Sequence, residues 1–90
     1  MLQLEQTKSF KKALKKFKHN QVVLNELKKI VELLVKEKEI PAKYRDHLLK
    51  GNLDGVRELH LKPDTLLLYI RIVKTKIILI NIGSRANTLK

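Results

Sequence analysis

Two histidines and one aspartate are the side chains of this 90-residue chain whose types best suit proton-transfer chemistry. His47 lies in the segment DHLLKG, and His60 lies in the segment RELHLKPD, which ends at Asp64. An imidazole titrates near pH 6.5, so at neutral pH it can either accept or donate a proton. The carboxylate of Asp64 follows His60 across a Lys-Pro turn, where it can orient the imidazole or simply cap the turn. These residues therefore indicate a general base and a general acid.

Two other interpretations of these residues stay open. Both histidines can be ordinary polar residues, and an aspartate after a proline is common in turns that have no catalytic role. Two histidines and a carboxylate can also bind a metal, but no fourth ligand is evident, so we expect no metal site and no cofactor. The chain contains no phosphate-binding loop, dinucleotide fingerprint or zinc-protease helix.

The charge of the chain predicts a polyanionic partner. Twenty lysines and arginines against nine acidic residues give a net charge of +11, and so strong an excess in a small domain is typical of nucleic-acid binding. A solvated lysine face that only keeps the protein soluble is the alternative. Binding to a membrane surface is less favoured, because the basic helix lacks tryptophan and a broad apolar face.

The length and composition predict one domain, residues 1–90, in a reducing compartment. The chain has no cysteine, so no disulfide or thiolate–metal framework supports it. No apolar run approaches the roughly 20 residues that cross a bilayer, and the N-terminus lacks the pattern of a signal peptide. We therefore expect a cytoplasmic protein that makes no contact with a membrane.

The elements that must position these residues follow from the hydrophobic periodicity. Alternation predicts a half-buried strand over 2–7, and helical spacing predicts one helix ending near 19–20 and a second over 20–39. Residues 41–55 read as a loop, and strands are expected over 56–61, 65–72 and 76–82. The two helices should form an antiparallel hairpin.

This order, β-α-α-β-β-β, predicts an α+β fold in which two N-terminal helices pack on one face of a mostly antiparallel sheet of four or five strands. The alternation of residues 56–61 puts Leu59 and Leu61 on the face toward the helices. Glu58 and His60 then lie on the second face, which we expect to meet solvent or a partner.

Several linked segments carry a family resemblance. YRDHLLKG, GVRELHLKPD, LLLY and a Gly-Ser near the C-terminus, in this order and spacing, resemble the YafQ branch of the RelE superfamily of bacterial toxins. The resemblance covers essentially the whole chain. It implies a type II toxin that cleaves messenger RNA on the ribosome by attack of the RNA 2′-hydroxyl on its own phosphate, without a metal. It also implies a cognate antitoxin, and contact with operator DNA only through the complex with that antitoxin.

The resemblance implies an active site that contains His47, His60 and Asp64, with His60 as the general base and His47 as the general acid or a phosphate contact. The chain departs from the family pattern near its end: Arg85 replaces the usual histidine, Asn81 an arginine, and Leu89 an aromatic residue. Arginine cannot transfer a proton near pH 7 but can hold a phosphate by charge. Arg85 therefore either clamps the phosphate in a working variant or weakens the activity.

Other cations are expected to bind RNA rather than to take part in the chemistry. We expect phosphate or RNA contacts from Lys50 and Arg57, together with Asn81 and Leu89, although Arg57 can equally form a structural ion pair. Exposed point charges on the first helix suit sequence-independent binding of ribosomal RNA. The lysines concerned are Lys8, Lys11, Lys12, Lys15, Lys16 and Lys18. The alternatives are a ParE-like gyrase inhibitor and a noncatalytic basic RNA-binding protein.

Overall fold

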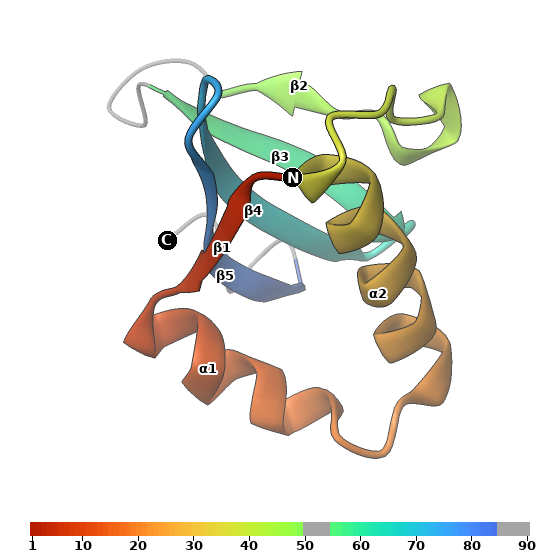
Figure 1. Ribbon diagram of the computed structural model, residues 1–90. Coiled ribbons are helices and arrows are strands. Elements are labelled where there is room, and N and C mark those ends of the chain that lie inside the picture. Colours follow the sequence, from red (N-terminus) through yellow and green to blue (C-terminus); the bar gives the residue numbers. More distant parts are fainter. Residues whose placement is uncertain (50–54, 85–90) are drawn as a thin grey trace.

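The computed structural model describes residues 1–49 and 55–84 as a small α+β domain (Figure 1). Two α-helices and two short 3-10 helices combine with five strands. In chain order the elements are β1 (Gln3–Gln6), α1 (Lys8–Leu14), η1 (Lys15–Phe17), α2 (Gln21–Val35), η2 (Ala42–Tyr44), β2 (His47–Leu48), β3 (Val56–Lys62), β4 (Thr65–Ile72) and β5 (Lys76–Ser84).

The strands form one mixed sheet in the order β1-β5-β4-β3-β2. The strands from β2 to β5 pair antiparallel, whereas β1 pairs parallel with β5. The predicted order lacked β2, because its two residues lie in the segment 41–55 that was expected to be a loop. Since both edges of the sheet are short strands, little unpaired backbone is offered there to other chains.

Side-chain caps begin both helices. The Thr7 hydroxyl accepts a hydrogen bond from the Phe10 N–H at the start of α1, and the Asn20 side-chain oxygen accepts one from the Val23 N–H at the start of α2. Thr7 also donates to the Ile80 carbonyl at 2.7 Å, which joins the beginning of α1 to β5. The first helix is shorter than predicted, because regular α-helix ends at Leu14 and continues as η1.

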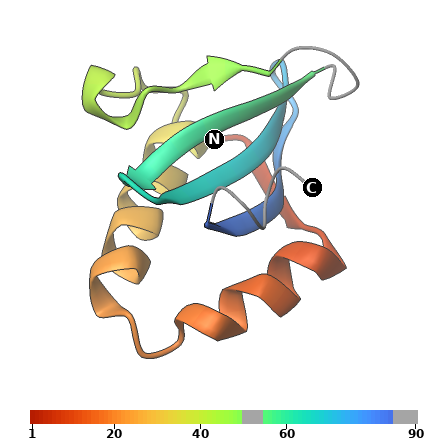
Figure 2. The same ribbon diagram turned by 180° about the vertical axis from the view of Figure 1, so that it is seen from behind.

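Both helices cover the same face of the sheet, as predicted (Figures 1 and 2). The predicted antiparallel hairpin is wrong. The two helices diverge in both views, and each packs on the sheet by itself, α1 against β5 and α2 against β3 and β5. The reason is that each apolar stripe is buried more completely by the wide sheet than by a second narrow helix.

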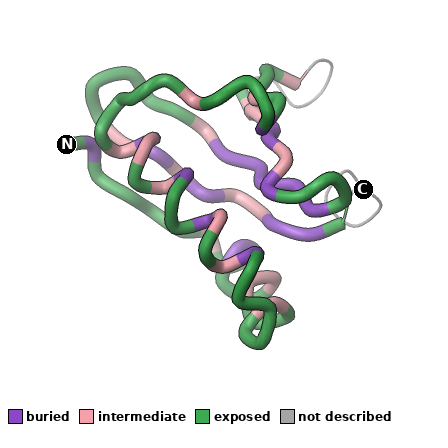
Figure 3. The backbone as a smooth tube through the Cα atoms, turned by 90° about the vertical axis from the view of Figure 1, so that its right-hand side faces the viewer, coloured by how far each residue is buried: buried purple, intermediate pink, exposed green. Residues whose placement is uncertain are grey.

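The core lies between the helices and the sheet, and Figure 3 shows buried positions along the middle of the strands and the inner sides of the helices. Phe10 and Ile30 come from the helices, while Leu59, Tyr69 and Ile77 come from the strands. The strand β1 is exposed along its whole length, contrary to the half-buried strand expected. No helix in the described ranges is long and apolar enough to cross a membrane.

Candidate active site

The segment that leads into β2 places His47 at the edge of the sheet, beside β3. Tyr44 anchors this segment, because its ring is buried and its hydroxyl donates to Glu26 Oε2 on α2 at 2.5 Å. Arg45 then adopts a left-handed backbone conformation with φ of 51°, which turns the chain. After this turn His47 pairs with Glu58 of the neighbouring strand β3.

A buried carboxylate lies between the two histidines. Glu58 Oε1 is 3.5 Å from His47 Nε2 and 3.6 Å from His60 Nε2, and the rings of the two histidines are 6.5 Å apart. We call these three residues the histidine–glutamate cluster. The side chain of Glu58 is 1% exposed, whereas those of His60 and His47 are 15% and 49% exposed. The two imidazoles therefore reach solvent above a carboxylate that does not.

The hydrogen bonds of the cluster indicate where its protons lie. His47 Nδ1 is 2.6 Å from the Arg45 carbonyl oxygen, which can only accept, so Nδ1 carries a proton. A proton on the opposite nitrogen, Nε2, then makes the ring cationic, and the Glu58 carboxylate beside that nitrogen stabilises the cation. Within the described part of the chain, Glu58 Oε2 is buried without a hydrogen-bond partner. The cluster therefore places two imidazoles beside one carboxylate that solvent does not reach.

Asp64 does not occupy the place expected for it. His60 faces Glu58, while Asp64 is exposed in the turn after β3 and accepts a hydrogen bond from the Thr65 hydroxyl at 3.4 Å. The register of β3 on β4 is irregular between His60 and Lys62, and such a bulge turns the following side chains away from their regular alternation. The carboxylate beside His60 in this structure is Glu58.

Arg57 takes part in a structural network and does not face the cluster. Its Nε and Nη2 donate to the two Asp46 oxygens at 3.3 and 3.2 Å, and the Tyr69 hydroxyl donates to Asp46 Oδ1 at 2.5 Å. Of the two roles that the sequence left open for Arg57, the structure shows the ion pair. Because Asp46 immediately precedes His47, this network fixes the position of the histidine.

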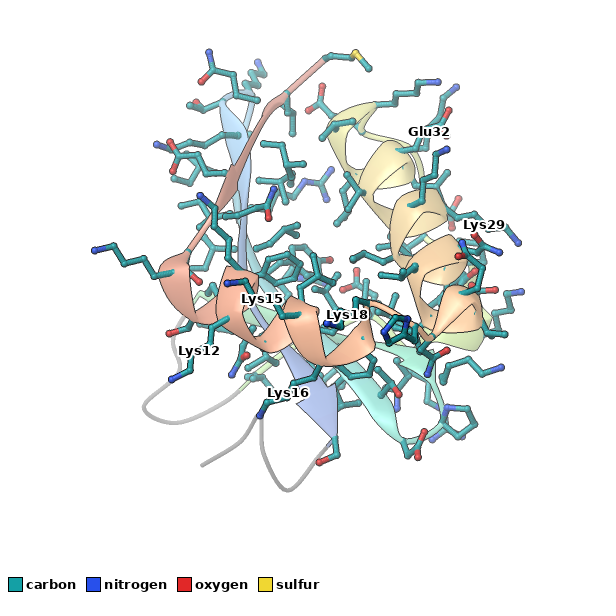
Figure 4. The ribbon with its side chains drawn as sticks, turned by 90° about the horizontal axis from the view of Figure 1, so that it is seen from below. Lys12, Lys15, Lys16, Lys18, Lys29 and Glu32 are labelled. Carbon is teal, nitrogen blue, oxygen red and sulfur yellow. The ribbon has the colours of Figure 1, made fainter. Side chains whose placement is uncertain are left out.

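The remaining predicted site residues lie apart from the cluster or outside the residues that the structure describes. Asn81 is on β5, beyond β4, and its side-chain oxygen accepts from the Ile82 N–H. Lys50, Arg85 and Leu89 lie outside the described residues, and their predicted roles stay predictions. The six lysines of residues 8–18 are exposed, and Figure 4 shows Lys12 and Lys16 projecting together from the first helical segment.

The sequence suggested no role for three residues that matter for the site. Alternation along β3 had put Glu58 on the face of His60, but the glutamate received no role. Asp46 was quoted only as part of a motif, and Tyr69 only as part of an apolar strand. The alternation was a usable signal for Glu58, whereas nothing local in the sequence pairs Asp46 with Tyr69.

Both tyrosines of the chain donate to carboxylates, and this predicts an unusual alkaline titration. Burial, followed by the hydrogen bond to Glu26, raises the pKa of Tyr44 to about 12. Burial and the bond to Asp46 raise the pKa of Tyr69 well above its usual value. A raised pKa contributes stability that is complete below the unfolded value of about 10 and is lost as pH rises through the folded value.

We therefore expect the folded chain to show little tyrosinate absorbance just above pH 10, where the urea-unfolded chain is about half ionised. Tyr44→Phe should leave one phenol that titrates abnormally, and Tyr69→Phe should leave the other. Equal absorbance of folded and unfolded protein at that pH would contradict the buried hydrogen bonds.

The described residues contain no group of three or more histidine, cysteine, aspartate or glutamate side chains arranged to hold a metal ion.

Comparisons of the sequence and of the structure with known proteins both find similar bacterial toxins. The family described as "Bacterial toxin of type II toxin-antitoxin system, YafQ" matches residues 2–90. The mRNA interferase toxin YafQ of Escherichia coli K12 is 40% identical over 47 residues, a stretch that spans only 51% of each protein. A metal-bound toxin from Helicobacter pylori is 40% identical, with a TM-score of 0.88 over 98% of this chain and 99% of that one. The E. coli DinJ-YafQ complex matches with a TM-score of 0.86 and 26% identity over the full length of both chains.

Proposed function

The chain belongs to the YafQ family of type II toxins, and we propose that it is an endoribonuclease that cleaves messenger RNA on the ribosome in the cytoplasm. The histidine–glutamate cluster carries this proposal, because it brings two imidazoles within 3.6 Å of one buried carboxylate. A noncatalytic RNA-binding protein or gyrase inhibitor has no need of such an arrangement. The E. coli relative is named an mRNA interferase, which supports the same activity.

The reaction requires two proton transfers and no cofactor. The RNA 2′-oxygen forms a bond to the adjacent phosphorus while the bond from phosphorus to the 5′-oxygen breaks, leaving a 2′,3′-cyclic phosphate and a 5′-hydroxyl. One imidazole takes the proton of the 2′-hydroxyl, and another group gives a proton to the departing 5′-oxygen. We assign the base to His60, and we assign the acid or a phosphate contact to His47.

Glu58 supports both transfers by stabilising whichever imidazole is cationic. His60 is cationic after it has taken the 2′-proton, and its Nε2 is 3.6 Å from the glutamate. A cation at His47 is stabilised in the same way from 3.5 Å. Arg85 is proposed to hold the negative charge that develops on phosphorus, and Asp64 is proposed to play an auxiliary role from the turn after β3.

Cleavage is expected to depend on the ribosome. Much of the His47 side chain is exposed, so we expect the ribosome to supply the positioning of the single-stranded RNA. Positioning of this kind is worth several kcal/mol of barrier. The measurement compares single-turnover cleavage of one messenger RNA, free and bound to programmed ribosomes, with mapping of the new 5′ ends.

A His60→Gln variant is the matched control for this experiment, because it should bind ribosomes and leave the message intact. Equal rates on free RNA and on programmed ribosomes would disprove the ribosome dependence. Failure of the parent protein to cut under either condition would disprove the endoribonuclease itself.

The lysines of the first helical segment are proposed to contact ribosomal RNA, since exposed point charges give affinity without sequence selection. A cognate antitoxin is the second proposed partner. The E. coli relative assembles with DinJ, and the +11 charge of this chain favours an acidic antitoxin segment. Operator DNA is expected to be bound only through that complex.

A further inference from the structure

A cavity opens beside His60, between α2, the segment that precedes β2 and the end of β3. Its volume is about 480 Å³, within the range of roughly 300–1,000 Å³ usual for small-ligand sites. The residues that line it come from α2, from the segment around η2, and from the end of β3. They are Glu26, Lys43, Tyr44, Arg45, His60, Leu61, Lys62 and Pro63.

The cavity is positively charged. Lys43, Arg45 and Lys62 are exposed around it, and no ion pair in the described ranges involves any of the three. Its one carboxylate, Glu26, already accepts a hydrogen bond from the Tyr44 hydroxyl. That bond and the surrounding lysines hold the pKa of Glu26 below its usual value. The cavity therefore offers three cationic donors to an anionic ligand.

The floor of the cavity is rigid. Tyr44 is 4% exposed and is tied to α2 through Glu26, and the Lys43 ammonium lies 5.1 Å from the centre of the Tyr44 ring. Leu61, 3% exposed, belongs to the core beneath β3. The segments that carry Lys43 and Lys62 are thus held beside His60 by buried neighbours.

We infer that this cavity binds the RNA phosphodiester next to the one that is cleaved, with Lys43, Arg45 and Lys62 as its ligands. The inference rests on the proposed function, because it assumes that the reacting phosphate lies at His60. A strand that passes from that phosphate into the cavity brings its next phosphate among the three cations. Since His60 itself lines the cavity, the two phosphate positions are continuous.

The test uses a triple variant, Lys43→Ala with Arg45→Asn and Lys62→Ala. Asparagine is chosen at position 45 because it tolerates the left-handed conformation, with φ of 51°, that the native residue adopts. Lys28→Ala is the matched control, since Lys28 is exposed on α2 and does not line the cavity. Thermal unfolding of each variant checks that the fold is intact.

The probe is a short fluorescein-labelled oligoribonucleotide that carries 2′-O-methyl groups, so that it cannot be cleaved. The parent and the control should bind it equally, while the triple variant should bind roughly tenfold more weakly at physiological salt. The slope of log affinity against log salt should fall by roughly 0.7, the value for one phosphate of a single strand that is no longer neutralised. Unchanged affinity and slope in the triple variant would overturn the inference.

Kinetics on ribosomes separate the possible ligands. The triple variant should require a higher concentration of programmed ribosomes than the parent for half-maximal cleavage. Its affinity for empty ribosomes should equal that of the parent, and a comparable loss there would assign the cations to ribosomal RNA and overturn the inference.

If the parent binds the oligonucleotide through these cations but never cleaves, the proposed function fails while the binding site stands. Stronger competition for the cavity by a polyglutamate peptide than by the oligonucleotide would point to an acidic protein segment as the occupant and overturn the inference.

Discussion

Replacing Glu58 with glutamine is expected to lower single-turnover cleavage of messenger RNA on saturated ribosomes by roughly 10²- to 10⁴-fold. Glutamine keeps the shape of the side chain but not the charge that lies 3.5 and 3.6 Å from the two imidazoles. Without that charge, neither histidine gains stabilisation when it takes up a proton. The measurement is the single-turnover rate of both proteins at matched ribosome occupancy.

The same substitution should leave the fold at least as stable as before. Glu58 is 1% exposed, and within the described residues one of its oxygens has no hydrogen-bond partner. An unpartnered buried polar group costs about 1–3 kcal/mol, more if it is charged. Glu58→Leu, which removes both oxygens, should therefore raise the free energy of unfolding by about that amount while abolishing cleavage.

Glu32→Gln serves as the control, because Glu32 pairs with Lys36 on the exposed side of α2, where Figure 4 shows it far from the sheet. It should change neither the cleavage rate nor the stability appreciably. The proposed role of Glu58 is refuted if Glu58→Gln cleaves within a few-fold of the parent rate.

The second large effect is on folding: Asp46→Ala should reduce the free energy of unfolding by about 3–5 kcal/mol. Asp46 accepts two hydrogen bonds from Arg57 and one from Tyr69. Its removal leaves a guanidinium that is 31% exposed and a tyrosine that is 0% exposed without their partner. Since small domains are stable by only about 5–15 kcal/mol, the loss should be evident in urea denaturation as a lower midpoint.

A double-mutant cycle locates this effect in the network. Tyr69→Phe alone should cost about 1–3 kcal/mol, and the cost of Asp46→Ala should be smaller in the Tyr69→Phe background. Glu5→Ala removes an exposed ion pair with Lys76 and should cost less than about 1 kcal/mol. Strict additivity in the cycle would show that Asp46 and Tyr69 do not act together.

Activity gives an independent readout of the same network. Because Asp46 precedes His47, loss of the Asp46 network in Asp46→Ala should lower the cleavage rate even at temperatures where the variant is fully folded. Asp46→Asn retains hydrogen-bond acceptance from Tyr69 and should recover part of the rate. A fully folded Asp46→Ala variant with the parental rate would show that the network does not position the histidine.

The sequence by itself determined the features that depend on local chemistry. Hydrophobic periodicity predicted both helices, and the apolar runs predicted β3, β4 and β5, because these signals act within one or two turns or along a single strand. The linked histidine motifs identified the family, which the match over residues 2–90 confirms. Alternation along β3 also placed Glu58 and His60 on the same face.

Only the tertiary structure decided which groups meet. A strand of two residues has no periodicity of its own, so β2 exists through its pairing with Arg57 and Glu58 and through the bonds from Arg57 and Tyr69 to Asp46. The parallel pairing of β1 with β5 is likewise absent from any local pattern, because alternation is the same in either strand direction. The carboxylate between the histidines follows from this assembly. Asp64 lies in the turn after β3. Glu58 is the carboxylate that strand pairing places opposite His47.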